Sequence, residues 1–163
     1  MCYAIWRSND IKWRMKPTIT TTWSYFFIWK EDDFEVHNYF EEEGFLGLQG
    51  VCNKVDKEVI IVNVYASCNI DKRSWLWDEL KNRRADSNIN LWCIIGNFNC
   101  VKWQHERQGE SSRVQESVES KEFNEFIEVM EVVDIPLVGR KFTWFRPNGS
   151  ARSRIDRVLI LEE

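Results

Sequence analysis

The stretch Trp92-Cys93-Ile94-Ile95-Gly96-Asn97-Phe98-Asn99 is the most informative part of the sequence, because an apolar run ends there in glycine and two amides. A short apolar run bounded in this way is typical of a buried strand. Proteins of the α/β class commonly place their reactive side chains where such strands end. We therefore interpret the run as scaffold, and the amides Asn97 and Asn99 as candidate site residues.

The segments around this stretch alternate between strand-like and helix-like patterns. β-forming residues at 45–51 and 59–65 flank a turn-like segment and predict a hairpin. Asp71 is expected to cap a helix that runs to about Arg84. A second helix is expected over 117–132, because its apolar side chains recur at spacings of three and four residues: Phe123, Phe126, Ile127 and Met130.

The rest of the chain completes the predicted order of elements. A polar, charged loop is expected over 104–116, and Pro136 and Gly139 are expected to end the second helix. Strands are expected at 142–145 and 154–161, with a turn between them.

The size and composition of the chain favour one α/β domain. It has 163 residues, of which 44% are hydrophobic, which is enough to bury a core. Continuous apolar runs such as 59–65 and 91–96 are typical of central strands that are buried on both faces. We therefore predict that these runs are neighbouring strands, with the apolar stripe of the second helix packed on their sheet.

Three segments give the chain a resemblance to the endonuclease/exonuclease/phosphatase superfamily. Gly96-Asn97-Phe98-Asn99 resembles its Gly-Asp-Phe-Asn motif, and Val62-Asn63-Val64-Tyr65-Ala66 resembles a strand that ends in an active-site tyrosine. Ser153-Arg154-Ile155-Asp156-Arg157 resembles its late Ser-Arg-Ile-Asp-Arg segment, and the three occur in the family's order. The segments at 122–126 and 137–144 are further similar to the endonuclease domain of plant LINE-type retrotransposons.

The resemblance implies a fold, a reaction and partners. The fold would be a four-layer α/β sandwich, present as a single partial domain over 1–163 and incomplete at both ends. The ancestral reaction would be Mg²⁺-dependent hydrolysis of a DNA phosphodiester, with DNA as substrate and a reverse-transcriptase domain as partner in the parent element. The implied catalytic positions are Tyr65, which donates to a phosphoryl oxygen; residue 97, which orients and helps to deprotonate the nucleophile; Asn99, which holds phosphate and water; and Asp156, which orients a histidine.

The chain departs from this family pattern in ways that predict an inactive copy. Asn97 stands where the family has aspartate, and an amide cannot accept a proton as a carboxylate does. The family's metal-binding glutamate is expected before this chain begins, and its terminal Asp-His after it stops. Trp23-Ser24 occupies the place of a Gly-Gly pair. We expect that Mg²⁺ is not bound productively. The changes from Asp to Asn, from Gly to Trp and from Gly to Ser each need one base change, as expected for the decay of a silent element.

The charge distribution allows only a local surface for nucleic acid. The net charge of −4 gives no overall basic footprint. The basic residues near the last motif are candidates for DNA contacts, although a solvated charged face is the simpler alternative. The candidates are Arg140, Lys141, Arg152, Arg154 and Arg157, with Arg146 beside them. The acidic stretch over 31–43 is expected to lie away from any phosphate backbone.

Simpler interpretations stay open for each candidate residue. Asn97 and Asn99 could be turn formers, Tyr65 a half-buried aromatic, and Asp156 one partner of a surface ion pair. If the resemblance holds, all four should converge at one rim of the sheet. A non-catalytic remnant, inert or weakly binding nucleic acid, is the alternative to a nuclease; a phosphatase acting on a small phosphoester fits the retrotransposon-like segments less well.

The location of the protein is inferred from two further patterns. The five cysteines are odd in number and lack the close pairs of a zinc site, so they are expected to be reduced thiols. No apolar window approaches the length of a membrane span. We expect an intracellular protein without a membrane partner, and the nucleus is an expected compartment for a DNA enzyme.

Overall fold

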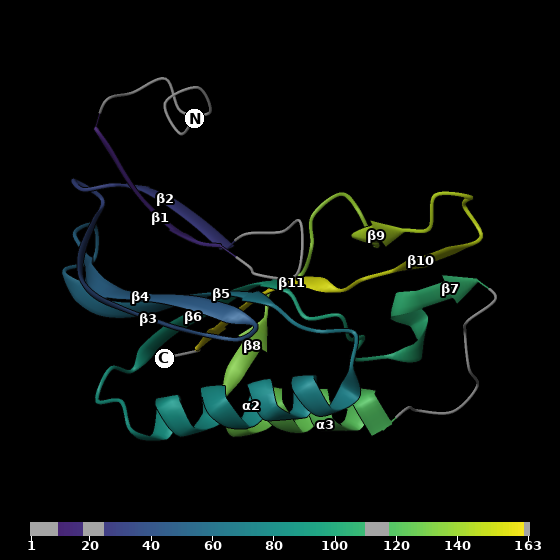
Figure 1. Ribbon diagram of the computed structural model, residues 1–163. Helices are drawn as coiled ribbons and strands as arrows, with labels where there is room; N and C mark the ends of the chain where they lie inside the picture. Colours follow the sequence, from purple (N-terminus) through teal and green to yellow (C-terminus); the bar gives the residue numbers. More distant parts are fainter. Residues whose placement is uncertain (1–9, 18–24, 110–117, 162–163) are drawn as a thin grey trace.

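A six-stranded sheet organises the computed structural model, which describes residues 10–17, 25–109 and 118–161 (Figure 1). The strand order is β3-β4-β5-β6-β11-β8. Only the central pair β5–β6 is parallel, and the other neighbours are antiparallel. The strands are β3 (Phe34–Glu42), β4 (Phe45–Cys52), β5 (Lys57–Tyr65), β6 (Leu91–Asn97), β8 (Val132–Asp134) and β11 (Asp156–Leu161).

The parallel pair at the centre follows from a helical crossover. Helix α2 (Ile70–Ala85) leads from the end of β5 to the start of β6, as parallel neighbours require. Its N-cap is Asn69, whose side chain accepts a hydrogen bond from the Lys72 backbone N–H at 3.0 Å. Asp71, the expected cap, lies in the first turn instead. The predicted β4–β5 hairpin and the predicted β5–β6 neighbours are both confirmed.

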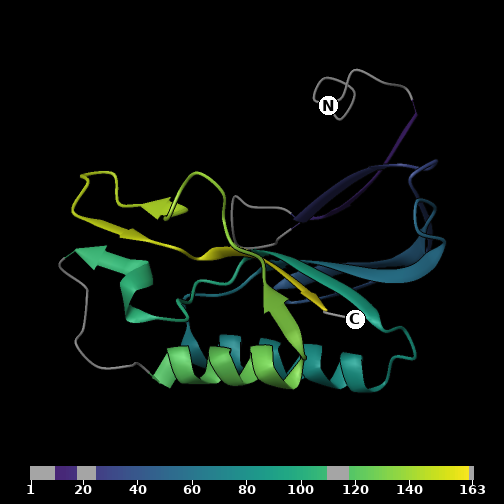
Figure 2. The same ribbon diagram turned by 180° about the vertical axis from the view of Figure 1, so that it is seen from behind.

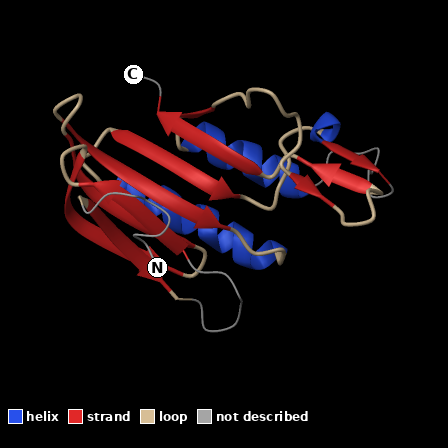
Figure 3. Cartoon of the chain, turned by 90° about the horizontal axis from the view of Figure 1, so that it is seen from above, coloured by secondary structure: helices blue, strands red, loops and turns tan. Residues whose placement is uncertain are grey.

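Both helices cover the same face of the sheet (Figure 2). Helix α3 (Val118–Val129) buries its predicted stripe in the core, which confirms that packing. Trp77 of α2 stacks on Phe126 of α3, with ring centroids 4.7 Å apart. Seen from above, the helices run beneath the strands (Figure 3). No helix among the described residues is both long and apolar enough to span a membrane.

The opposite face of the sheet is only partly covered. The hairpin of β1 (Ile11–Lys16) and β2 (Tyr25–Lys30) lies on that side, and the Tyr25 hydroxyl donates to the Tyr65 carbonyl at 3.2 Å. Further along the face, Ile95 is 40% exposed and Ile160 is 36% exposed. The central strands are therefore buried on the helix side, and the expectation of burial on both faces is wrong for part of the sheet.

A small three-stranded sheet extends beyond one end of the large one (Figure 1). The predicted strand over 154–161 corresponds to β11, which begins at Asp156, and a separate strand of the small sheet ends just before it at Ser153. The expected loop over 104–116 begins with a short helix η1 (Gln104–Glu106) and a strand, and its residues 110–116 lie outside the described ranges. The small sheet consists of β7 (Arg107–Gly109), β10 (Ala151–Ser153) and β9 (Trp144–Phe145).

Two strands fall where the sequence pattern indicated something else. Helix α3 ends at Val129, before the expected Pro136 and Gly139, because Glu131 adopts a left-handed backbone (φ 55°) and β8 starts at once. The acidic stretch over 31–43 contains β3, an edge strand of the large sheet. The positions of Trp23 and Ser24 lie outside the described residues.

Candidate functional site

Three of the four predicted catalytic positions form one row across the sheet. Tyr65, the last residue of β5, pairs with Asn97, the last residue of β6. Asn97 in turn pairs with Asp156, the first residue of β11. Directly paired residues on adjacent strands project from the same face. Since Val64 and Ile94 point into the helix-side core, this row lies on the opposite face, at the end of the sheet from which the small sheet extends.

The fourth position, Asn99, lies in a tight turn that follows the row. The Asn97 side-chain oxygen accepts from the Asn99 backbone N–H at 2.8 Å, and the Asn99 side-chain amide donates to the Ala66 carbonyl at 2.5 Å. Asn99 has a left-handed backbone (φ 48°), which asparagine tolerates better than most residues. The turn-forming interpretation of both amides is therefore confirmed, and any contact with phosphate stays a prediction.

Thr143, which no sequence motif indicates as a site residue, holds the backbone of Asp156 in place. The Thr143 hydroxyl oxygen accepts from the backbone N–H groups of Ile155 and Asp156, each at 3.0 Å. These bonds fix the chain where it crosses from β10 to β11. Asp156 makes no ion pair with a described residue, so the alternative of a surface ion pair is wrong within that part of the chain.

The arginines that flank Asp156 are paired with two other carboxylates in a buried cluster. Arg157 bridges Glu106 (2.5 Å) and Asp134 (2.6 Å), and Arg154 contacts the same two residues at 3.2 and 2.7 Å. The side chain of Arg157 is 0% exposed and that of Arg154 is 16% exposed. The prediction that Arg154 and Arg157 contact DNA is wrong in this structure, because their guanidinium groups hold the fold together.

The ion-pair cluster also sets the charge state of Glu106. Burial alone raises the pKa of this carboxyl, because the charged form loses its hydration. The hydrogen bond and the positive charge of Arg157 act in the other direction, and the net result is a pKa below the usual glutamate value. Glu106 is thus a buried carboxylate in the folded protein.

The other three basic candidates stay on the surface. Arg140, Lys141 and Arg152 are exposed, and the guanidinium carbon of Arg152 lies 4.7 Å from the centre of the ring of Phe142, which is buried. On the same small sheet, Trp144 is 40% exposed and Phe145 is 51% exposed. We call these residues, Arg140, Lys141, Arg152, Trp144 and Phe145, the basic-aromatic edge.

The described residues do not fit the Mg²⁺ ion that the family resemblance implies. Mg²⁺ prefers carboxylate and water oxygens in an octahedral arrangement. Of the four predicted catalytic positions only Asp156 is a carboxylate, and the Asn97 oxygen already accepts an N–H group. Among the described residues, no group of three or more acidic, histidine or cysteine side chains could hold a metal ion.

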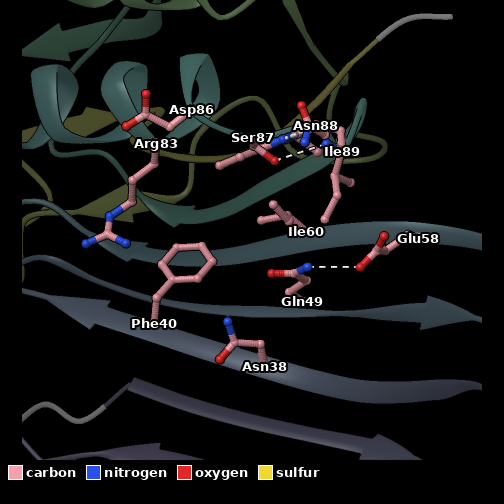
Figure 4. A pocket seen from close by; sticks show the side chains of 11 residues that line it. Asn38, Phe40, Gln49, Glu58, Ile60, Arg83, Asp86, Ser87, Asn88 and Ile89 are labelled. Carbon is pink, nitrogen blue, oxygen red and sulfur yellow. Dashed lines mark hydrogen bonds between the residues drawn. The ribbon is translucent and has the colours of Figure 1, made fainter.

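A pocket of about 530 Å³ lies near the other end of β5, away from the rim (Figure 4). Two of its polar side chains bond with each other, since the Gln49 amide donates to Glu58 at 2.9 Å. Arg83 is held by Glu79 at 2.7 Å. Because Glu58 is at the start of β5 and Tyr65 at its end, this pocket is separate from the candidate site.

Comparisons with known proteins place the fold. No family model matches the sequence, and no curated protein matches it. Solved structures do match. A Bacteroides thetaiotaomicron protein of the endonuclease/exonuclease/phosphatase family has a TM-score of 0.56 at 12% identity, over 94% of this chain and 60% of that one. The chain has the fold of endonuclease/exonuclease/phosphatase proteins. This confirms the predicted fold class.

Two further structures show how broadly this fold is shared. The endonuclease domain of TRAS1, a telomere-specific non-LTR retrotransposon, has a TM-score of 0.66 at 12% identity, over 95% of this chain and 68% of that domain. Truncated TDP2 of Caenorhabditis elegans has a TM-score of 0.57 at 16% identity, over 94% of this chain. The chain spans 62% of that TDP2 structure and is thus shorter than these endonuclease/exonuclease/phosphatase domains.

Proposed function

We propose that this chain is a domain derived from a retrotransposon endonuclease and that it does not hydrolyse phosphodiesters in its present form. The resemblance of the segments at 122–126 and 137–144 to plant LINE-type endonucleases supports the origin, and the fold shared with the TRAS1 domain agrees with it. DNA and a reverse-transcriptase domain would be partners of the parent element. The proposed loss of activity rests on one observation: an amide, that of Asn97, lies at the centre of the Tyr65–Asn97–Asp156 row.

The chemistry of the row explains why one amide matters. Hydrolysis needs a group that takes a proton from the attacking water, and removing such a base typically costs about 10²–10⁴-fold in rate. A carboxylate at position 97 could accept the Asn99 N–H with one oxygen and a proton with the other. The amide of Asn97 has one oxygen, which already accepts that N–H, and its nitrogen is not basic.

A plasmid-nicking assay tests this proposal. The purified chain is incubated with supercoiled plasmid and Mg²⁺, and conversion to the open-circular form is followed over time. We expect conversion no faster than in the buffer control. Metal-dependent conversion by the unaltered chain, abolished in an Asp156→Asn variant, would show that the row is catalytic without a carboxylate at position 97 and would overturn the proposal.

A second candidate function, weak binding of single-stranded nucleic acid, is favoured by the basic-aromatic edge. Exposed aromatic rings beside cationic groups can stack on bases while the cations contact phosphates, and stacking is worth about 1–3 kcal/mol per base. Phe145 of β9 pairs directly with Arg152 of β10, so this exposed ring and this cation project from the same face of the small sheet, whereas Trp144 projects from the other face. The net charge of −4 predicts that such binding is weak and falls steeply with salt.

Fluorescence anisotropy of a labelled oligonucleotide tests this second candidate. We expect saturable binding at low salt that weakens strongly as the salt concentration rises. Phe145→Ala should weaken it further, whereas Trp75→Ala, which removes an aromatic ring of similar exposure on α2, should leave it unchanged. Equal losses in the two variants would assign the binding to general surface charge and contradict a role for the edge.

A further inference from the structure

Arg73 is a buried arginine beneath the candidate rim, and only 4% of it is exposed. It lies in the first half of α2, directly below the loops that follow β5 and β6. Its Nη1 atom lies within hydrogen-bond distance of three backbone carbonyls: Ser67 at 3.2 Å, Cys68 at 3.3 Å and Asn99 at 3.3 Å. Its Nη2 atom is 3.0 Å from a carboxylate oxygen of Glu119 on α3.

These contacts connect the loop after β5, the loop after β6 and helix α3, which are separate segments of the sequence. Ser67 and Cys68 follow Tyr65 at the end of β5, and Asn99 follows Asn97 at the end of β6. Nη1 carries two N–H groups, so three carbonyls must share them. A planar guanidinium can bond with both loops from one nitrogen while the other nitrogen faces α3, which the compact ammonium of lysine cannot reproduce.

Asn99 completes the connection between the two loops. Its side-chain amide donates to Ala66, and its backbone N–H donates to the side chain of Asn97. The bond from Arg73 to the Asn99 carbonyl therefore fixes the residue that spans both strand ends. The Glu119 carboxylate balances the buried charge and orients the guanidinium.

We propose that Arg73 is the positioning residue of the rim: it sets the place of Asn99, and through Asn99 the distance between the ends of β5 and β6. This inference rests on the proposed function, which identifies these strand ends as the former active site. Arg73 itself touches no reacting group in this scheme. Its effect on the site passes through the carbonyl of Asn99 and the loop at Ser67 and Cys68.

NMR, read residue by residue, separates positioning from general stabilisation. In Arg73→Lys and Arg73→Met variants, we expect the native-state amide chemical shifts of Ala66 and Asn99 to move, while those in the centre of β4 and of α3 stay unchanged. Amide exchange should rise at least about ten-fold at Ala66 and Asn99, and the rise in the centre of β4 and of α3 reports the overall loss of stability.

Two matched variants complete the experiment. Lys72→Met removes the neighbouring but exposed cation of α2 and should leave the Ala66 and Asn99 amides unchanged. Glu119→Gln removes the ion pair but keeps the three carbonyl contacts, and should raise exchange at the rim less than Arg73→Met does.

The outcome that overturns the proposal is unchanged chemical shifts at Ala66 and Asn99 in both Arg73 variants, or shifts that move equally across rim and core. The lysine variant keeps the charge opposite Glu119, so it provides the comparison if the methionine variant fails to fold. Hydrogen exchange uses no nucleic acid. Nicking by the unaltered chain would therefore contradict the proposed function and leave the result for Arg73 standing.

Discussion

Asn97 and Asp156 lie directly opposite each other on the antiparallel ladder of β6 and β11. The pairing puts an amide beside a carboxylate on the same face, at the end of the sheet. A carboxylate in place of the amide would bring two like charges together, which raises the pKa of one of them unless a cation lies between. The present pair needs no such cation, and this makes the row compatible with a protein that has lost its metal chemistry.

We expect that Asn97→Asp alone does not produce a nuclease. The restored carboxylate supplies a base, but no group of three or more acidic, histidine or cysteine side chains among the described residues could hold the metal ion. Groups that act on one reaction as a unit contribute in a strongly non-additive way. The plasmid assay should therefore give the same background rate for this variant, the unaltered chain and an Asn97→Ala control. A Mg²⁺-dependent rate unique to the aspartate variant would show that the missing groups are dispensable.

Arg157→Met should destabilise the fold strongly. Methionine fills a similar volume but leaves two carboxylates, Glu106 and Asp134, which are 5% and 7% exposed, to share the single guanidinium of Arg154. Breaking a buried ion pair from one side typically costs about 3–5 kcal/mol. Urea unfolding measures the loss, with Arg152→Met on the exposed small sheet as the control, where we expect a change within about 0.5 kcal/mol. Similar values for the two variants would mean that the buried cluster contributes little.

The stability of the protein should fall as the pH is lowered into the acid range, in part because of Glu106. Its pKa in the folded protein lies below the ordinary value, so its contribution is complete above the unfolded-state pKa and is lost as the pH falls through the folded-state pKa. Glu106→Gln should be less stable at neutral pH and should lose less on acidification. Unfolding free energies at several pH values from neutral to about 3 test this, and parallel curves for the two proteins would contradict it.

Gly96→Ala should be poorly tolerated. Gly96 has φ 138°, and a Cβ atom there would lie 2.0 Å from the Val64 carbonyl oxygen of the neighbouring strand. The clash is with backbone in the centre of the sheet, so we expect a loss of at least about 3 kcal/mol. Gly149→Ala is the matched control, because it also has a positive φ (74°) but has nothing within 4 Å, and should cost about 1 kcal/mol. Thermal unfolding of both variants distinguishes strain in the strand pair from the general effect of losing a glycine.

The elements that could be predicted from the sequence are those with a long or periodic apolar pattern. The runs that became β4, β5 and β6 and the stripe of α3 carry their own signal, and all four lie where they were expected. Strand β8 has three residues, too few for a period to show, and follows the helix after one left-handed residue. The cap at Asn69 was missed because Asp71, two residues later, is an equally good capping type.

The residues of the site also fall into two groups: those that sequence motifs predict and those that only the contacts in the structure identify. The order of the motifs was enough to bring Tyr65, Asn97 and Asp156 into one row. The sequence shows that Arg157 is charged, but its partner Glu106 lies 51 residues away and could not be inferred from spacing. Arg73 and Thr143 act on backbone groups, which carry no sequence signature at all.

The acidic edge strand β3 has a consequence for self-association. It is nine residues long and pairs with β4 on one side only, so its outer backbone groups could serve as a template for strand addition. A register shift between Val36 and Asn38 interrupts that template, and Glu35, Glu41 and Glu42 give the strand an excess of acidic side chains. The interrupted register and the concentration of carboxylates along β3 therefore favour a sheet that ends at this strand instead of growing by the addition of another copy.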